Sequence, residues 1–118
     1  MNRYCIRKSY TIKEAIDKIE ESHDRVVLVV NDNERIIGVI SQGDIIRALS
    51  SGKSLYARVE GIIQPDFLYL NDKNMKKAYE MFKKKKITLL PVVDKDYYLK
   101  EVITLESIYN YLEGGKDE

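Results

Sequence analysis

Three residues near one predicted strand-to-helix junction have the types and spacing to bind a phosphate and a sugar: Gly38, Ser41 and Asp44. A glycine lets a ligand approach the backbone of a strand closely. A serine at a helix start places its hydroxyl beside backbone N–H groups that have no partner within the helix, and a phosphate fits there. The Asp44 carboxylate can accept hydrogen bonds from both hydroxyls of a ribose.

A purely structural interpretation of the same residues remains open. Ser41 is a favourable N-cap, because its side-chain oxygen can accept a hydrogen bond from a backbone N–H in the first turn. Asp44 adds a negative charge near the positive end of the helix dipole. Both interpretations predict a helix that begins directly after Ser41, and only the first requires a ligand.

The chain that positions these residues contains an internal repeat. A shift of 63 positions, the separation of Gly38 and Glu101, aligns the two halves without a gap. Apolar residues that align include Ala15 with Ala78, Val29 and Val30 with Val92 and Val93, and Val39 and Ile40 with Val102 and Ile103. We therefore expect residues 1–118 to form one module of two repeats, at about 1–55 and about 64–118.

Each copy predicts the order helix, strand, strand, helix. In the first copy, Thr11 and Glu14 have the spacing of a capping box before an amphipathic helix. Strands at 26–30 and 36–40 flank a turn, and the second helix opens at 41–44 and ends near Gly52. The second copy predicts a helix at 74–84, strands at 88–93 and 98–103, and a helix at 105–112. Short leading strands are expected at 4–6 and at the end of the linker 55–70.

This order of elements predicts an α+β fold, similar to a sandwich. One copy has an apolar sheet face that it cannot cover alone, so two copies are expected to pack sheet against sheet around a pseudo-twofold axis with a cleft between them. The helices also carry apolar faces that need cover, which predicts a homodimer. Those faces contain Ile45, Ile46 and Leu49 in the first copy and Ile108, Tyr109 and Leu112 in the second.

Composition excludes several classes of function. The formal net charge of +1 supplies no general attraction to nucleic acid or to a membrane surface. The apolar runs are far shorter than the ~20 residues of a membrane span, and neither a leader pattern nor a cysteine pair is evident, so a cytoplasmic protein is expected.

His23 has no neighbours at metal-ligand spacing, and no catalytic triad or carboxylate pair is present. We expect no catalysis, no metal and no required cofactor.

Two segments resemble the signatures of cystathionine-β-synthase-type (CBS) repeats. Residues 38–44, with the sequence GVISQGD, are similar to the pattern of glycine, an apolar residue, any residue, Thr or Ser, two further residues and Asp that marks the nucleotide site of that family. Residues 90–94, LPVVD, resemble its companion signature. The resemblance covers nearly the whole chain. It implies a tandem CBS pair that binds an adenine nucleotide, such as AMP, ADP, ATP or another adenosyl ligand, and regulates without catalysing.

The resemblance also implies a set of binding residues. In the family, the ribose-binding aspartate of one repeat faces a base pocket that the other repeat contributes. The residues implied from the second copy are Lys73, Ala78, Ile87 and Thr88 around the adenine, with Lys86 near the phosphates. A lysine run at a helix end is more commonly just solvated. We prefer that reading for Lys83 and Lys84, and both readings stay open for Lys85 and Lys86.

The second copy departs from the nucleotide pattern at two positions. Glu101 stands in place of the glycine and Ser107 in place of the aspartate, so that only Thr104 remains. The corresponding surroundings, His23 to Arg25, place the negative charge of Asp24 where a phosphate would be expected. The sequence therefore predicts one competent site per chain, with Thr104 and Ser107 marking a degenerate second site.

Two alternatives to nucleotide sensing stay open. One is a structural dimerisation module whose site is vestigial. The other follows from residues 11–15 and 43–49, TIKEA and GDIIRAL, which are similar to CBS pairs placed ahead of sugar-phosphate nucleotidyltransferase domains. In that case the chain is the N-terminal, non-catalytic part of such an enzyme, and its partner is a downstream catalytic domain.

Overall fold

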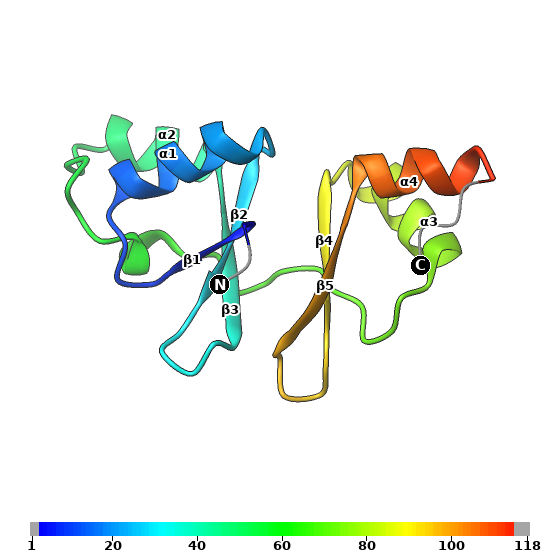
Figure 1. The fold of residues 1–118 in the computed structure, drawn as a ribbon. Helices are drawn as coiled ribbons and strands as arrows, with labels where there is room; N and C mark the ends of the chain where they lie inside the picture. Colours follow the sequence, from blue (N-terminus) through cyan, green and yellow to red (C-terminus); the bar gives the residue numbers. More distant parts are fainter. Residues whose placement is uncertain (1–2, 115–118) are drawn as a thin grey trace. The chain divides into compact units, whose positions relative to one another are not determined.

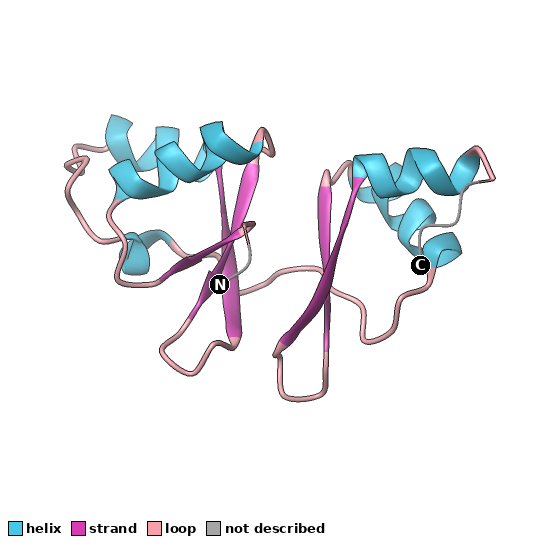
Figure 2. Cartoon of the chain, viewed as in Figure 1, coloured by secondary structure: helices cyan, strands magenta, loops and turns pink. Residues whose placement is uncertain are grey.

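The computed structural model describes residues 3–114 and divides the chain into two compact units, Met1–Phe67 and Leu68–Glu118. Each unit contains one copy of the repeat, with a small sheet and two α-helices (Figures 1 and 2). The α+β fold class that the sequence predicts is confirmed.

The first unit is built on a three-stranded sheet in the order β1–β2–β3. Its elements are β1 (Cys5–Arg7), α1 (Ile12–Ser22), β2 (Val26–Val30), β3 (Ile36–Ser41), α2 (Gln42–Ser50) and the 3₁₀ helix η1 (Val59–Ile62). Strand β1 is parallel to β2, and β2 is antiparallel to β3. The helices α1 and α2 contact each other (Figure 1).

The second unit repeats this order with a smaller sheet. Its elements are α3 (Met75–Lys85), β4 (Leu89–Val93), β5 (Leu99–Thr104) and α4 (Leu105–Leu112). Strands β4 and β5 form an antiparallel pair, and α3 contacts α4. Every helix and main strand predicted from the sequence is present, with boundaries that differ by at most about two residues.

The leading strand expected before the second copy is reduced to a single parallel bridge between Leu70 and Val92. Proline explains the difference. In the first unit, the backbone N–H of Leu28 donates to the Tyr4 carbonyl at 2.8 Å and so ties the start of the leading strand to β2. The residue 63 positions after Leu28 is Pro91, which has no N–H to donate.

The backbone of the two units repeats even where the side chains differ. Among residues 3–114, the non-glycine residues with positive φ are His23, Glu34, Lys86 and Tyr97. They form two pairs that are 63 positions apart, since His23 and Lys86 end the first helix of each copy and Glu34 and Tyr97 lie in each hairpin turn. The irregularity in the strand pairing also recurs, at Val29/Val30 and Val92/Val93. The duplication is thus visible in the backbone as well as in the sequence.

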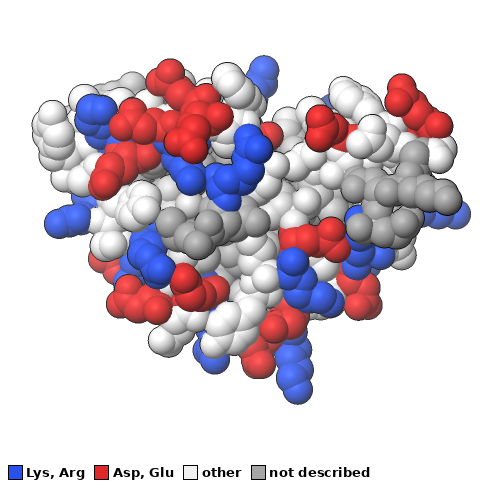
Figure 3. Space-filling model, in the orientation of Figure 1, with Lys and Arg blue, Asp and Glu red and all other residues white. Residues whose placement is uncertain are grey.

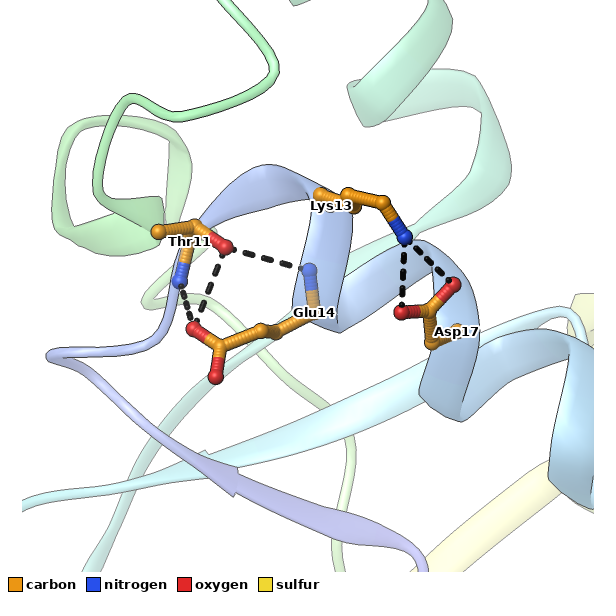
Figure 4. A network of polar contacts seen from close by, with 4 residues as sticks. All are labelled: Thr11, Lys13, Glu14 and Asp17. Atoms are coloured by element: carbon orange, nitrogen blue, oxygen red, sulfur yellow. Dashed lines mark hydrogen bonds and ion pairs between the residues drawn. The ribbon is translucent and has the colours of Figure 1, made fainter.

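A capping box fixes the start of α1, as the sequence predicts. The Thr11 backbone N–H donates to Glu14 Oε1 at 2.8 Å, and the Glu14 backbone N–H donates to Thr11 Oγ1 at 3.2 Å (Figure 4). One turn further, Lys13 Nζ lies 3.2 Å from Asp17 Oδ2. The two capping bonds satisfy backbone groups that have no partner inside the helix.

Each unit has a hydrophobic core of its own. The first core comprises Ile6, Ile12, Ala15, Ile19, Val27, Val29, Ile40, Ile45, Ala48 and Val59. The second comprises Leu70, Ala78, Phe82, Leu90, Val92, Ile103 and Ile108. Ile45 and Ile108 therefore do not belong to the helix faces expected to need cover in a dimer, because both are buried inside their own units.

The linker returns to the first sheet and pairs with β3 at Val39, next to Gly38. The Val39 N–H donates to the Gln64 carbonyl at 3.0 Å, and the Gln64 N–H donates to the Val39 carbonyl at 2.9 Å. A β-carbon on Gly38 would collide with Ile63 Cγ2 and with the Gln64 carbonyl oxygen. The chain's own linker therefore makes the close approach for which the sequence analysis invoked a ligand.

We predict that Gly38→Ala lowers the free energy of unfolding by about 1–3 kcal/mol, the usual cost of overpacking, because the added methyl group must displace the linker. Chemical denaturation monitored by circular dichroism measures this loss. The matched control is Gly61→Ala, whose β-carbon would meet only Lys53 Nζ, at 3.8 Å. Equal stability of the two variants would show that the linker does not require glycine at position 38.

We predict that Cys5 is unreactive in the folded chain. Its residue is 2% exposed, and burial raises the pKa of the thiol to about 11, although the charge of Lys18 opposes this shift. The reactive species is the thiolate, which is scarce at pH 8 when the pKa lies so high. A colorimetric thiol reagent at pH 8 should modify Cys5 only after denaturation. Labelling of the native chain at the denatured rate would contradict the burial of this thiol.

Candidate functional site

The candidate site lies where β3 passes into α2, and it is built on a second capping box. The Asp44 backbone N–H donates to Ser41 Oγ at 3.2 Å. In return, the Ser41 backbone N–H donates to Asp44 Oδ2 at 2.9 Å. The structure therefore brings Ser41 and Asp44 together, and the helix start itself holds the carboxylate in a fixed orientation.

The other oxygen of the Asp44 carboxylate has two further partners. Arg47 Nη2 donates to Oδ1 at 2.6 Å, and Gln64 Nε2 donates to the same atom at 3.4 Å. Asp44 is only 8% exposed, one of two buried polar residues among those that the structure describes. A carboxylate this enclosed needs such partners, because an unpaired charge is costly to bury.

The partners of Oδ1 can be exchanged more easily than those of Oδ2. The Arg47 side chain is 73% exposed, so it can leave the carboxylate and remain hydrated. The Gln64 contact is long for a hydrogen bond. Ionised carboxylates accept about four hydrogen bonds in all. Oδ2 thus anchors the group to the helix, whereas Oδ1 is the atom at which a ligand hydroxyl can replace a protein donor.

Gly38 acts on this carboxylate through the linker. The absence of a side chain at position 38 lets residues 63 and 64 approach β3, and the side chain of Gln64 then reaches Asp44. Sequence reasoning found Gly38 and Asp44 but missed Gln64, which lies 20 positions after Asp44 and carries no local signal. Arg47 was also missed, although its position three residues after Asp44 on a helix could have indicated the contact.

The second copy retains the capping box but not the charge. The Ser107 N–H donates to Thr104 Oγ1, and the Thr104 N–H donates to Ser107 Oγ, both at 3.3 Å. Ser107 therefore replaces Asp44 in the structural role. A serine hydroxyl accepts more weakly than a carboxylate, so this junction offers no charged acceptor to a ribose.

Lys73 lies beside the residue that replaces the motif glycine. Its Nζ is 3.5 Å from Glu101 Oε1, and its side chain is 17% exposed. The opposite charges stabilise the ammonium group where it stands. Any ligand group that contacts Lys73 must therefore compete with Glu101.

The other residues implied for the base pocket differ in their exposure to solvent. Ala78 is fully buried in the second core, so its side chain packs against protein atoms. Lys86 is exposed and ends α3 in the left-handed conformation, with its N–H bonded to the Phe82 carbonyl. Ile87 and Thr88 follow it and are half-buried. Of these residues, Ile87 and Thr88 are therefore partly exposed to solvent and could contact a base.

The corresponding segment of the first unit lines a hollow of about 330 Å³. Its lining comprises Ile19, Glu20, His23, Asp24, Arg25 and Gln42. Burial raises the pKa of Asp24 above its usual value, while the charges of Arg3 and His23 oppose the shift.

Within residues 3–114, no group of three or more His, Cys, Asp and Glu side chains is arranged to hold a metal ion. None of the helices described there is long and apolar enough to cross a membrane.

Comparisons with solved structures agree on the fold. A putative acetoin utilization protein from Vibrio cholerae superposes with a TM-score of 0.82, at 24% identity over 94% of this chain and 83% of that one. A CBS domain protein from Pyrobaculum aerophilum, complexed with AMP, gives a TM-score of 0.72 at 19% identity over 94% and 91%. At these identities the likeness shows the fold alone.

Comparisons of sequence identify the family. An inosine-5'-monophosphate dehydrogenase of Nitrosopumilus maritimus is 25% identical over 122 residues, which are 99% of this chain and 24% of that protein. The chain spans only 24–29% of the length of such curated relatives. Residues 1–51 and 59–114 each match the CBS domain. These two matches take in most of the sequence, and the chain therefore belongs to the CBS domain family as a tandem pair.

Proposed function

We propose that this CBS pair is a regulatory module that binds an adenine nucleotide at the β3–α2 junction. The observation that carries the proposal is the Asp44 carboxylate, which is anchored through Oδ2 and held by exchangeable donors at Oδ1. Such an acceptor suits the vicinal hydroxyls of a ribose, because charged acceptors make the stronger hydrogen bonds. The AMP bound by the Pyrobaculum aerophilum protein of the same fold supports the choice of ligand.

Base and phosphate contacts from the second copy stay a prediction from the family resemblance. Ile87 and Thr88 are half-buried, so their apolar groups and backbone suit an adenine. Lys86 is exposed and suits a phosphate, whereas Lys73, which pairs with Glu101, stays assigned to the surroundings of the adenine. Thr104 and Ser107 remain a degenerate second site.

A vestigial site in a structural module is the second candidate. The observation in its favour is that Ser41, Arg47 and Gln64 already occupy the Asp44 carboxylate. Under this alternative the capping box is the whole function of the motif. A binding measurement separates the two candidates, because the structural role needs no ligand.

The module is proposed to act on a catalytic domain. Relatives such as the inosine-5'-monophosphate dehydrogenase are about four times as long as this chain, which favours regulation of an activity that lies outside the pair. The more specific association with a sugar-phosphate nucleotidyltransferase stays a prediction from residues 11–15 and 43–49.

We predict that Asp44→Ala weakens adenine-nucleotide binding by about 1.5–3 kcal/mol, roughly 10- to 150-fold in Kd, because a charged acceptor is lost. Ser107→Ala is the matched control, since it removes the corresponding capping bond in the other copy. It should leave the affinity nearly unchanged. Isothermal titration calorimetry with AMP, ADP and ATP measures both variants, after circular dichroism has shown that they are folded.

The outcomes of this pair of variants are distinct. Equal losses would show that the second copy also binds nucleotide. Undiminished binding by Asp44→Ala would place the ligand elsewhere and return Asp44 to a capping role. Absence of binding by the parent chain, at nucleotide concentrations up to the millimolar range, would favour the vestigial module.

We also propose that the chain self-associates as a twofold dimer through its helices. Ile46 on α2 is 63% exposed, and Tyr109 and Leu112 on α4 are 59% and 51% exposed. Sedimentation at micromolar concentration should show a dimer, and Tyr109→Glu should weaken it because a charge is costly to bury in an interface. Asn110→Glu, on the same helix, is the control. A parent chain that sediments only as a monomer would contradict this proposal.

A further inference from the structure

The second unit has a hollow at the turn end of its hairpin, outside the candidate nucleotide site. Its volume is about 620 Å³, within the range of small-molecule sites. The lining comprises Tyr69, Asn71, Asp94, Lys95, Tyr97 and Lys100, all of them in the second unit. Ile87 and Thr88 precede β4, whereas Asp94 follows it. The strand between them has five residues and spans roughly 17 Å, at about 3.3 Å per residue.

The pairing register of the leading segment differs between the two copies. In the first copy, Ile6 pairs with Val29. In the second copy, Leu70 bridges to Val92, which lies 63 positions after Val29. Leu70 lies 64 positions after Ile6, so the leading segment of the second copy is shifted by one residue relative to the rest of the repeat.

This shift places different side chains at the turn end of the two hairpins. In the first copy, Arg7 follows the paired residue and forms an ion pair with Glu34 of the turn at 2.9 Å. In the second copy, Asn71 follows the paired residue, and Tyr97 lies 63 positions after Glu34. The Asn71 side chain is shorter, and its Nδ2 donates to the Val93 carbonyl at 3.3 Å. An amide and an aromatic ring therefore line the place that an ion pair takes in the first copy.

Two tyrosine rings form one wall of the hollow. The rings of Tyr69 and Tyr97 meet edge to face, with their centroids 5.5 Å apart and an angle of 72° between the planes. Their hydroxyl oxygens are 3.2 Å apart, which is within hydrogen-bond distance. The hydrogen bond with Tyr97 raises the pKa of Tyr69 above its usual value, so Tyr69 stays uncharged at neutral pH and does not repel an anion.

The turn itself holds the Tyr97 ring in place. Asp94 Oδ1 accepts hydrogen bonds from the backbone N–H groups of Asp96 at 2.8 Å and Tyr98 at 3.0 Å. The Tyr97 N–H donates to the Asp94 carbonyl at 3.0 Å. Tyr97 has a φ of 70°, in the left-handed region that suits glycine and is unfavourable for a bulky side chain. A ring kept at such a position points to a role beyond the turn.

The charged groups of the lining favour an anion. Lys100 Nζ donates to the Asn71 carbonyl at 2.8 Å and lies 4.0 Å from Asp72 Oδ1. The carbonyl fixes the ammonium group and uses one of its three donors. Lys95 is exposed, and Asp94 is the one carboxylate among the described lining residues. Two ammonium groups and one carboxylate give the lining a charge of +1, and Figure 3 shows basic and acidic side chains together over the β4–β5 hairpin.

We propose that this hollow binds a small aromatic carboxylate, whose ring packs against Tyr97 and whose carboxylate accepts a hydrogen bond from Lys100. One carboxylate balances the charge of the lining, whereas the two charges of a phosphate dianion exceed it. The aromatic wall gives the ring of such a ligand a contact that an inorganic anion cannot make. The site is independent of the proposed nucleotide site, because it uses none of the residues assigned there.

The test titrates the full chain with benzoate and follows the backbone amide signals by NMR. Shifts are expected at residues 94–98 and at Asn71. Lys100→Gln should raise the Kd about three- to tenfold, because a partly exposed charged donor is lost. Tyr97→Gly should raise it about two- to tenfold, because the ring contact is lost. Glycine suits the backbone at position 97, so this variant should keep the turn intact.

Each variant has a matched control. Lys84→Gln removes one charge from an exposed lysine of α3, and Glu34→Gly makes the glycine change at the equivalent position of the first hairpin. Both controls should bind benzoate as the parent chain does. Circular dichroism of every variant excludes unfolding as the cause of a loss.

Two further probes separate the parts of the ligand. Inorganic phosphate has the charge without the ring, and benzamide has the ring without the charge, so both should bind more weakly than benzoate. Phosphate that binds as tightly would overturn the role of the ring, and benzamide that binds as tightly would overturn the role of the lysines. Unchanged signals at residues 94–98 in millimolar benzoate would overturn the site itself, as would an unchanged Kd in both Lys100→Gln and Tyr97→Gly.

Discussion

A reciprocal pair of hydrogen bonds at the start of α2 is the constraint on which the candidate site depends. It joins Ser41 and Asp44, ends β3, begins the helix and turns one carboxylate oxygen away from the backbone. The structural and the ligand-binding interpretations of these residues therefore do not compete for the same atom. Oδ2 serves the helix, and Oδ1 is bonded to donors that lie outside the capping box. A single aspartate can serve both purposes because its two oxygens face different partners.

The second copy shows what remains when only the structural role is kept. Thr104 and Ser107 retain both capping bonds, so the helix still begins at the same place without a charged group. Glu101 replaces the glycine and pairs with Lys73 instead of admitting a linker. Capping requires an oxygen atom but not a charge, and a hydroxyl satisfies it. Capping alone therefore does not explain the difference between Asp44 and Ser107, and the charge of Asp44 is met in the structure by Arg47 and Gln64.

Local signals in the sequence were sufficient for the order of elements and most of their boundaries. The capping box at Thr11 and the apolar run of β2 act over a few residues, so they can be recognised without the tertiary structure. Contacts between distant residues could not be predicted in this way. The closeness of the linker to Gly38, the reach of Gln64 to Asp44 and the ion pair of Lys73 each depend on how the chain returns to a sheet. Pro91 shortens the second leading strand through a missing donor, an effect that appears only when the two copies are compared.

Duplication makes such comparisons possible, because two copies of one backbone can diverge at equivalent positions. Both copies end their first helix in the left-handed conformation, at His23 and Lys86. The residues just before that end face solvent and are free to change charge without disturbing a core. The acidic side chains of α1 and the lysines of α3 partly cancel in the net charge of the chain, which stays close to zero. A nearly neutral net charge is therefore compatible with strongly charged single helices. In a duplicated fold, the charge of each helix says more about its binding partners than the net charge of the chain does.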